Sequence, residues 1–216
     1  MIPKIVHAIW LGDKPFDFTP IEEQWRSVLD DYLIRLWREG DVSNSCCIVG
    51  AEVASCFNYS LAHKLYGAAS NIARLALLYL CGGIYLDTDV EVLKKFDLKQ
   101  NGFLGFQRDD TPTDCLNTAV MGCVPLNRTV ERLLHKITLD SPFCDQIWAS
   151  CTLPTEELFL KRGGEGFNVT QSADDFTLYD KSYFHPFRWD EDSEGGRKGV
   201  KDSTVTIHHW EASWKC

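Results

Sequence analysis

Apolar residues follow two different spacings along the chain, and each spacing predicts a different kind of element. Residues 4–11 form an apolar, β-rich run that ends in a turn sequence at 12–15, which predicts a first, central strand and its loop. Thr19 and Pro20, followed by acidic residues, are typical of a helix start, and we expect this helix to continue to about residue 37. The chain therefore begins with a β-α unit.

The middle of the chain adds a longer helix and a second apolar strand. Residues 61–81 are helical in character, and the glycine pair that follows them predicts a stop before a strand at 84–92. Residues 41–60 are mixed and favour no single element. The later chain favours short elements, with strands near 103–107, 118–124, 176–179 and 204–209 and helices near 127–138 and 155–161.

A β-α start followed by strand-rich sequence predicts an α/β fold whose sheet ends in an antiparallel part. Ligands of such sheets bind beyond the carboxyl ends of the central strands, where both Trp10 and Asp87 are expected to lie. The 216 residues, 44% of them hydrophobic, suit one packed domain. Residues 190–203 are charged and rich in glycine, which predicts a surface loop or lid.

The net charge of −9 argues against a nucleic-acid or anionic-membrane partner, because it provides no long-range positive field. A phosphate-bearing small ligand then needs local help from a metal, from basic side chains or from backbone amides. The nine cysteines show no CxxC spacing, and we interpret them as reduced thiols. Neither a leader sequence nor a membrane span is visible, so we expect a cytoplasmic protein, either a monomer or a domain of a larger chain.

The strand at 84–92 carries the first candidate site. Asp87 and Asp89 flank Thr88, so on an extended segment both carboxylates point to one face and repel each other. Two interpretations stay open from this stretch alone. It is either a strand that turns into a solvated acidic loop or a site for a divalent metal.

A second polar group interrupts an otherwise apolar helix. Ser70, Asn71 and Arg74 lie three or four residues apart, so they share one face near the helix start. A buried arginine needs a partner. That partner is either an internal carboxylate such as Asp87, or the phosphate or hydroxyl groups of a ligand, which suit a guanidinium fork.

The third cluster closes the chain, where residues 205–214 place two histidines and two tryptophans on a strand-like tail. Packing at a sheet edge explains such residues, and so does a binding site. Imidazole is a frequent ligand of divalent transition metals, and the Ser213 hydroxyl and Trp214 indole are donors for phosphate oxygens. Either His208 or His209 is the candidate ligand.

Together, the three clusters resemble the recurring blocks of glycosyltransferase family 32, the DXD-containing sugar transferases. The first block reads IPKIVHAIWLG at 2–12, the central block runs from Ser70 to Leu93 and includes GGIYLDTDVEVL, and the last reads HHWEASW at 208–214. The region 95–204 matches only loosely. The glucosylating domains of bacterial toxins share these motifs but are far longer.

This resemblance implies a single GT-A domain over 1–216, Rossmann-like, with a mixed, mainly parallel sheet flanked by helices. It implies a nucleotide-binding part at about 1–95 and an acceptor-side part at about 96–216. The reaction would move a sugar from a nucleotide-sugar donor, preferably a UDP-sugar, to a glycan or glycoprotein hydroxyl with retention at the anomeric carbon. GDP-mannose is the alternative donor. A bound Mn²⁺ or Mg²⁺ ion would stabilise the diphosphate leaving group.

The resemblance also assigns roles at the metal and the diphosphate. Asp89 is the first choice as metal ligand, and Asp87 is expected to contact the ribose, the metal or both, with Thr88 between them in the donor site. Arg74 is expected to reach the donor sugar or phosphate, which makes it a catalytic candidate with the two aspartates. His208 is the better-matched histidine for the metal or a phosphate.

Further donor contacts are implied at the two chain ends. Trp10 is expected to stack on the nucleotide base, while main-chain atoms of Ala8 and Ile9 read the edge of the base. Ser213 and Trp214 are expected to close over the diphosphate.

One departure from the family pattern concerns Asn71, where related enzymes usually carry Asp; the change removes a negative charge beside Arg74 and bears on recognition of the sugar hydroxyls. Asp109, Asp110 and Asp145 are acceptor-side carboxylates or solvated loop charges, and an inverting reaction would need one of them as its base. A degenerate module that binds a nucleotide sugar or a glycan without turnover is the alternative to an enzyme.

Overall fold

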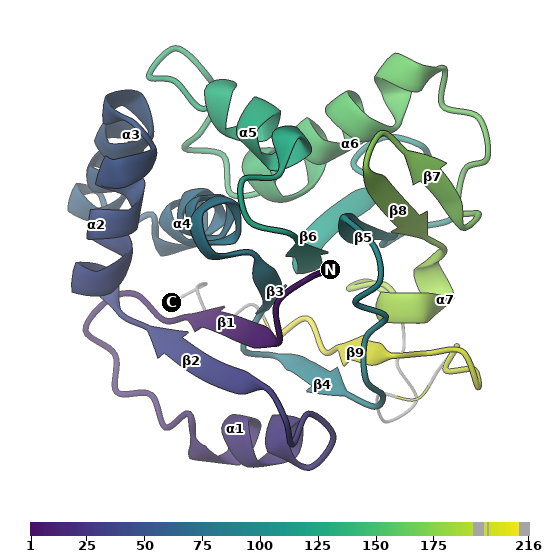
Figure 1. The fold of residues 1–216 in the computed structure, drawn as a ribbon. Coiled ribbons are helices and arrows are strands. Elements are labelled where there is room, and N and C mark those ends of the chain that lie inside the picture. Colours follow the sequence, from purple (N-terminus) through teal and green to yellow (C-terminus); the bar gives the residue numbers. More distant parts are fainter. Residues whose placement is uncertain (192–196, 198, 212–216) are drawn as a thin grey trace.

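The computed structural model of the chain describes residues 1–191, 197 and 199–211, and its centre is a seven-stranded mixed sheet (Figure 1). Its strands are β1 (Ile5–Ile9), β2 (Leu33–Trp37), β3 (Gly83–Leu86), β5 (Gly102–Phe106), β6 (Leu116–Cys123), β7 (Gln171–Ala173) and β8 (Phe176–Tyr179). They lie in the order β2-β1-β3-β6-β5-β8-β7. β6 and β7 run antiparallel to their neighbours, whereas the other strands share one direction. The predicted α/β fold with a mainly parallel sheet is confirmed.

Helices cover one face of this sheet and a smaller layer covers the other (Figure 1). The first face carries α2 (Glu39–Val49), α3 (Ala51–Ala62), α4 (Tyr66–Cys81), α5 (Arg128–His135), a π-helix (Trp148–Thr152), α6 (Leu153–Leu158) and a 3-10 turn (Leu160–Arg162). The other face carries α1 (Thr19–Arg26), α7 (Lys181–Phe184) and a two-stranded antiparallel sheet of β4 (Val90–Val92) and β9 (Thr206–His208).

Two hydrophobic cores, one on each face of the sheet, follow from the alternation of side chains along the strands. On β3, Ile84 and Leu86 belong to the core shared with α1 and β4, whereas Tyr85 belongs to the core shared with α4. The residues of α4 from Ala68 to Leu78 are nearly all buried, because α4 lies between the sheet and the outer helices α2 and α3. The prediction of a buried helix is confirmed.

The turn from α4 into β3 depends on a glycine pair and on a buried histidine. Gly82 and Gly83 have φ angles of 62° and 96°, and a Cβ at Gly83 would lie 2.7 Å from the Ile5 carbonyl oxygen. His7 on β1 receives a hydrogen bond from the Trp37 indole at Nδ1 (3.0 Å), so its Nε2 donates to the Gly82 carbonyl (2.8 Å). These contacts fix the position at which β3 begins. Because β3 has only four residues, they also fix the position of Asp87, which follows it.

Two predicted elements differ from the structure. The helix expected to continue to about residue 37 is wrong, because α1 ends at Arg26 and residues 33–37 form β2. Pairing with β1 along its whole length decides this, since it buries Ile34 in one core and Trp37 in the other.

The strand expected at 84–92 is two strands, β3 and β4, which belong to different sheets. The Asp87 amide still donates to the Ala119 carbonyl of β6 (2.9 Å), but the Val90 amide turns back to the Asp87 carbonyl (3.1 Å). The two aspartates therefore lie in a turn between the strands and not on one extended segment.

The remaining elements lie close to their predicted positions. Residues 41–60, left unassigned, form α2 and most of α3, and the helical stretch 61–81 is broken at 63–65; β7 and α7 were not predicted. Residues 192–196 and 198 of the predicted lid lie outside the described residues, so the lid stays a prediction. Of the helices in the described part of the chain, none combines the length and the apolar character that a bilayer crossing requires.

Candidate active site

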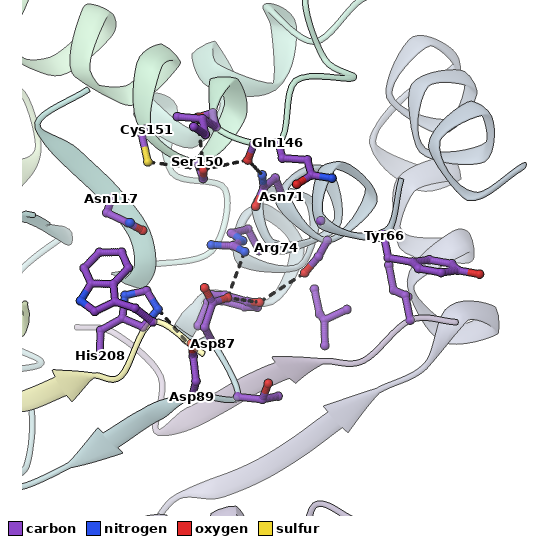
Figure 2. A pocket seen from close by; sticks show the side chains of 18 of the residues that line it. Tyr66, Asn71, Arg74, Asp87, Asp89, Asn117, Gln146, Ser150, Cys151 and His208 are labelled. Carbon is purple, nitrogen blue, oxygen red and sulfur yellow. Dashed lines mark hydrogen bonds and ion pairs between the residues drawn. The ribbon is translucent and has the colours of Figure 1, made fainter. Parts of the chain in front are cut away.

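A cleft of about 720 Å³ lies at the edge of the sheet where the parallel strands end (Figure 2). Trp10 follows β1, Asp87 follows β3 and Gln107 follows β5, while Asn117 lies at the start of the antiparallel β6. The strand order β1-β3-β6-β5 therefore places Trp10, Asp87, Asn117 and Gln107 in that sequence along the cleft. The first turns of α4 and the π-helix complete the lining.

Asp87, Asp89 and His208 form a cluster in the middle of this cleft (Figure 2). One ligand atom from each lies within 4.8 Å of the others. β9 brings the histidine here, because His208 pairs with Val90, the residue directly after Asp89. His208 Nε2 is 3.2 Å from one Asp89 oxygen, and the other oxygen accepts a hydrogen bond from the Glu211 amide (2.9 Å).

The surroundings of Asp89 and His208 favour the charged form of each side chain. Burial alone would raise the pKa of Asp89, but the facing His208 imidazole and the Glu211 amide lower that pKa to about 2. Burial alone would lower the pKa of His208, but the Asp89 carboxylate raises it above its ordinary value. Asp89 is therefore ionised at neutral pH.

This donor set fits a divalent cation. Carboxylate oxygens suit both Mg²⁺ and Mn²⁺, and an imidazole nitrogen favours Mn²⁺. The cluster is mostly withdrawn from solvent, since the Asp89 and His208 side chains are 13% and 6% exposed. A cation there would balance the negative charge of two carboxylates, one of which contacts Arg74 and the other His208.

Arg74 has the internal partner that its burial requires. Its guanidinium is 3.0 Å from an Asp87 oxygen, donates to the Thr118 hydroxyl (3.1 Å) and lies 4.4 Å from the centre of the Tyr85 ring. The Tyr85 hydroxyl donates to the same Asp87 oxygen (2.7 Å), and burial raises the pKa of this phenol, so it stays protonated. Arg74 and Tyr85 together fix the orientation of the first DXD carboxylate.

Asn71 connects α4 to the opposite wall of the cleft. Its amide nitrogen donates to the Gln146 carbonyl (2.7 Å), two residues before the π-helix, and its side chain is almost fully buried. The neighbouring Ser70 hydroxyl lies 3.4 Å from the Tyr85 hydroxyl. The amide at this position therefore makes a contact that a carboxylate, which only accepts hydrogen bonds, does not make.

The N-terminal block contributes an aromatic surface at the end of the cleft beside β1. Trp10 and Ile9 line it, whereas Ala8 lies fully buried within β1. The Trp10 ring stacks on Phe16 at 3.8 Å and donates to the Lys14 carbonyl (3.2 Å). The indole is thus held in one orientation beside the cleft.

Other sequence-based candidates lie elsewhere. His209 faces Glu91 on the far side of β9 (3.2 Å), so His208 is the histidine of the cluster. Asp109 pairs with Lys181, Asp110 pairs with Arg108 and Arg188, and Asp145 accepts from the Ile147 amide, and the cleft is lined by none of the three. Ser213 and Trp214 lie outside the described residues.

Several lining residues were missed by the sequence reasoning. Asp114, Gln107, Asn117, Ser150 and Trp189 come from loops and strand ends of the later chain, where the resemblance to the family is only loose. The Asn117 amide donates to the Gln107 carbonyl oxygen (2.6 Å), and the Gln107 amide donates to the Asp114 carbonyl (2.6 Å). Only the position of Asn117 and Gln107 at predicted strand ends hinted at a place on the cleft.

Comparisons with known proteins agree with this geometry. The family model described as the glycosyltransferase sugar-binding region containing DXD motif matches residues 15–104. No curated protein sequence matches the chain.

Among solved structures, the PaToxG glycosyltransferase is similar at a TM-score of 0.57 and 18% identity, over 76% of this chain and 70% of that one. The UDP-bound glycosyltransferase domain of the YGT toxin is similar at a TM-score of 0.44 and 12% identity, over 62% of this chain and 61% of that one. The chain therefore spans less than two thirds of that domain. A glycosyltransferase involved in glycosylation of the major capsid of PBCV-1 is similar at a TM-score of 0.45 and 11% identity. This match covers 97% of this chain and 95% of that one.

The family match includes the DXD segment and α4, and the likeness to the PaToxG glycosyltransferase supports the fold. Residues 15–104 are therefore similar to the DXD-containing sugar-binding region of glycosyltransferases, and the chain has a GT-A-like glycosyltransferase fold.

Proposed function

We propose that the chain transfers a sugar from a UDP-sugar to a glycan hydroxyl in a metal-dependent reaction that retains the configuration at the anomeric carbon. The observation that supports this most directly is the Asp87, Asp89 and His208 cluster in the middle of the cleft. The cleft volume of about 720 Å³ is within the range of small-molecule sites and suits a nucleotide sugar with part of its acceptor.

The order of residues along the cleft suggests how the donor lies. Trp10 would stack on the nucleotide base at the end of the cleft beside β1, and the diphosphate would lie at the cluster of Asp87, Asp89 and His208. The donor sugar would then point toward Asn117 and Gln107, where it would meet the acceptor. In this arrangement residues 1–95 supply most of the nucleotide site, and residues 96–216 supply most of the acceptor side.

Asp87, Asp89 and His208 would hold Mn²⁺ or Mg²⁺. When bound, the ion supplies positive charge that stabilises the departing diphosphate. Arg74 holds the Asp87 carboxylate in place at 3.0 Å, and the Glu211 amide holds that of Asp89, so both carboxylates are oriented before the donor binds. Neither would have to reorganise during the reaction.

Retention fits the positions of the three acidic side chains that the sequence offered as bases for an inverting reaction. An inverting transferase needs a carboxylate base beside the acceptor hydroxyl. Asp109, Asp110 and Asp145 are engaged outside the cleft, which leaves Asp114 as the acidic residue on the acceptor side among the described lining residues. A retaining reaction has no requirement for such a base.

Thermal stability with and without nucleotides tests this proposal, because a ligand that binds only the folded state raises the melting temperature. UDP and GDP are each added with and without Mn²⁺ to the wild-type protein, to Asp89→Asn and to Asp13→Asn, a second carboxylate that lines the cleft but lies outside the cluster. We expect a UDP shift that Mn²⁺ increases and that Asp89→Asn abolishes, while Asp13→Asn keeps the metal dependence.

The outcomes separate the alternatives. A Mn²⁺-dependent shift with GDP alone would replace UDP by GDP as the donor nucleotide. Equal shifts with and without Mn²⁺ would contradict metal dependence. A Mn²⁺-dependent UDP shift without sugar release from any UDP-sugar would indicate a binding module instead of an enzyme.

A further inference from the structure

We propose that Trp189 is a stacking platform for a hexose ring of the acceptor, and that the acceptor is an uncharged saccharide. This inference rests on the proposed function, since it assigns the acceptor end of the same cleft. Trp189 lines the cleft and is 72% exposed. An exposed aromatic side chain that lines a ligand-sized cleft is suited to stack on a ligand.

The indole is exposed on a turn that the structure holds firmly in place. Arg188 pairs with Asp190 through two hydrogen bonds (both 2.8 Å) and with Asp110 (2.6 Å). The Arg188 amide also donates to Glu191 (2.7 Å), which closes the turn around Trp189. The position of the indole is therefore set by its neighbours, and little conformational freedom is lost when a ring stacks on it.

The turn is also tied to the metal cluster. The Trp210 indole donates to the Phe187 carbonyl (2.9 Å), and the Trp210 ring lies 3.9 Å from that of His208. Trp189 therefore belongs to the wall that begins at His208, whereas Trp10 lies at the end of β1. A donor whose diphosphate is at the cluster and whose base is at Trp10 leaves the Trp189 end for the acceptor.

The polar groups at this end favour an uncharged sugar. Asn117 and Gln107 are neutral amides fixed by their mutual hydrogen bond, and such planar groups suit sugar hydroxyls. The charged lining residues there have both signs, Asp114 and Arg108, and Arg108 also makes a two-point contact with Asp110 (2.8 and 3.2 Å), so this end presents no excess charge that would select an ionic sugar. A hexose presents hydroxyls to such amides and its apolar C–H face to an indole.

Ligand-observed NMR tests this without turnover. Saturation transfer from the protein to maltose, cellobiose, lactose and mannobiose is measured for the wild-type chain, Trp189→Ala, Trp189→Phe and Ile48→Ala, with serine- and threonine-containing peptides as the other acceptor class. Ile48 is a matched control, since it is 71% exposed and lies on α2, away from the cleft. We expect at least one disaccharide to bind, with a loss of about tenfold in affinity for Trp189→Ala and near-wild-type affinity for Trp189→Phe and Ile48→Ala.

Failure of this inference is distinct from failure of the proposed function. Disaccharide affinity that is unchanged in Trp189→Ala, or binding of peptides and of no saccharide, overturns the platform even where UDP binds with Mn²⁺. Saccharide binding that requires Trp189 supports the platform even where no nucleotide binds. Melting curves of Trp189→Ala confirm that the fold is intact, which its exposure predicts.

Discussion

The two ends of the cleft are built by different means. At the proposed donor end, Asp87 and Arg74 project from the end of β3 and from the buried helix α4, and the Arg74 side chain is 5% exposed and that of Asp87 26% exposed. At the acceptor end, Arg108 and Trp189 lie on loops that are joined by partly exposed ion pairs, chiefly those of Asp110.

This difference has an energetic meaning. Breaking a buried, hydrogen-bonded charge pair costs several kcal/mol, whereas an exposed ion pair contributes about 0–1 kcal/mol. The donor end is therefore part of the fold itself, and the acceptor end is not. Substitutions that change the acceptor leave the fold intact, while substitutions at the donor end affect fold and chemistry together.

The largest effect is expected at the centre of the donor end. Asp89→Ala removes a ligand of the proposed metal, and we expect turnover with a UDP-sugar to fall by about 1,000-fold, equivalent to about 4 kcal/mol. Steady-state kinetics measures the loss. Circular dichroism and a melting curve, matched against Asp13→Ala, check that folding is retained. Activity that survives with unchanged dependence on Mn²⁺ would remove Asp89 from the metal site.

The turn that positions β3 is expected to respond to acid. Burial lowers the pKa of His7 to about 4, below its usual 6.5, so the unfolded chain takes up a proton first as the pH falls. This contribution to stability is complete above about pH 6.5 and is lost by about pH 4, which amounts to about 3 kcal/mol.

Urea denaturation of the wild type and of His7→Asn between pH 7 and 4 measures this contribution. We expect His7→Asn to be less stable at pH 7 and to lose less stability on acidification. Substitution of the exposed His63 serves as the control, and we expect it to keep the wild-type dependence of the free energy of unfolding on pH. Parallel slopes for the wild type and His7→Asn would show that His7 is protonated equally in both states.

Asn71 tests the connection between the two ends. Asn71→Asp replaces the amide that donates to the Gln146 carbonyl with a carboxylate, so two acceptors face each other in a buried place. We expect a stability loss of about 1–3 kcal/mol and a higher KM for the UDP-sugar. Asn71→Ser removes the same hydrogen bond without adding charge and separates the two causes. Equal stability of all three proteins would contradict a structural role for the amide.

The smallest effect on stability is expected at the acceptor end. Asp110→Asn weakens the contacts to Arg108 and Arg188, and the free energy of unfolding should change by less than about 1 kcal/mol. The KM for a saccharide acceptor should nevertheless rise severalfold, because the turn that carries Trp189 loses an anchor, while the KM for the donor is unchanged. Asp140→Asn, another exposed carboxylate, is the control. A matching rise in the donor KM would contradict the separation of the two ends.

The sequence predicts the donor end well because its chemistry is local. The glycine pair, the apolar strand and the two aspartates follow one another within a dozen residues, and the spacing of Ser70, Asn71 and Arg74 places them on one helix face. The internal partner of Arg74 was one of the two predicted alternatives and is Asp87. The exception is β2, where a strong helix start outweighed a strand whose partner lies elsewhere in the chain.

The acceptor end could not be predicted in the same way, because tertiary contacts decide it. Asp109, Asp110 and Asp145 have the same local character as Asp114, yet each of the three is held by other partners, and of the four only Asp114 lines the cleft. Trp189 lies in a short turn without periodicity, so its exposure depends on contacts that single-sequence patterns do not contain.

The pairing of β4 with β9 has a consequence for the order in which the protein matures. β4 follows the DXD segment at once, but β9, which brings His208 to Asp89, is synthesised after every strand of the seven-stranded sheet. A nascent chain that already contains every residue from 15 to 104 still lacks the third member of the cluster. Competence to bind the proposed metal with all three side chains therefore arises only after the seven-stranded sheet has been synthesised, so a product that terminates before β9 cannot assemble this site.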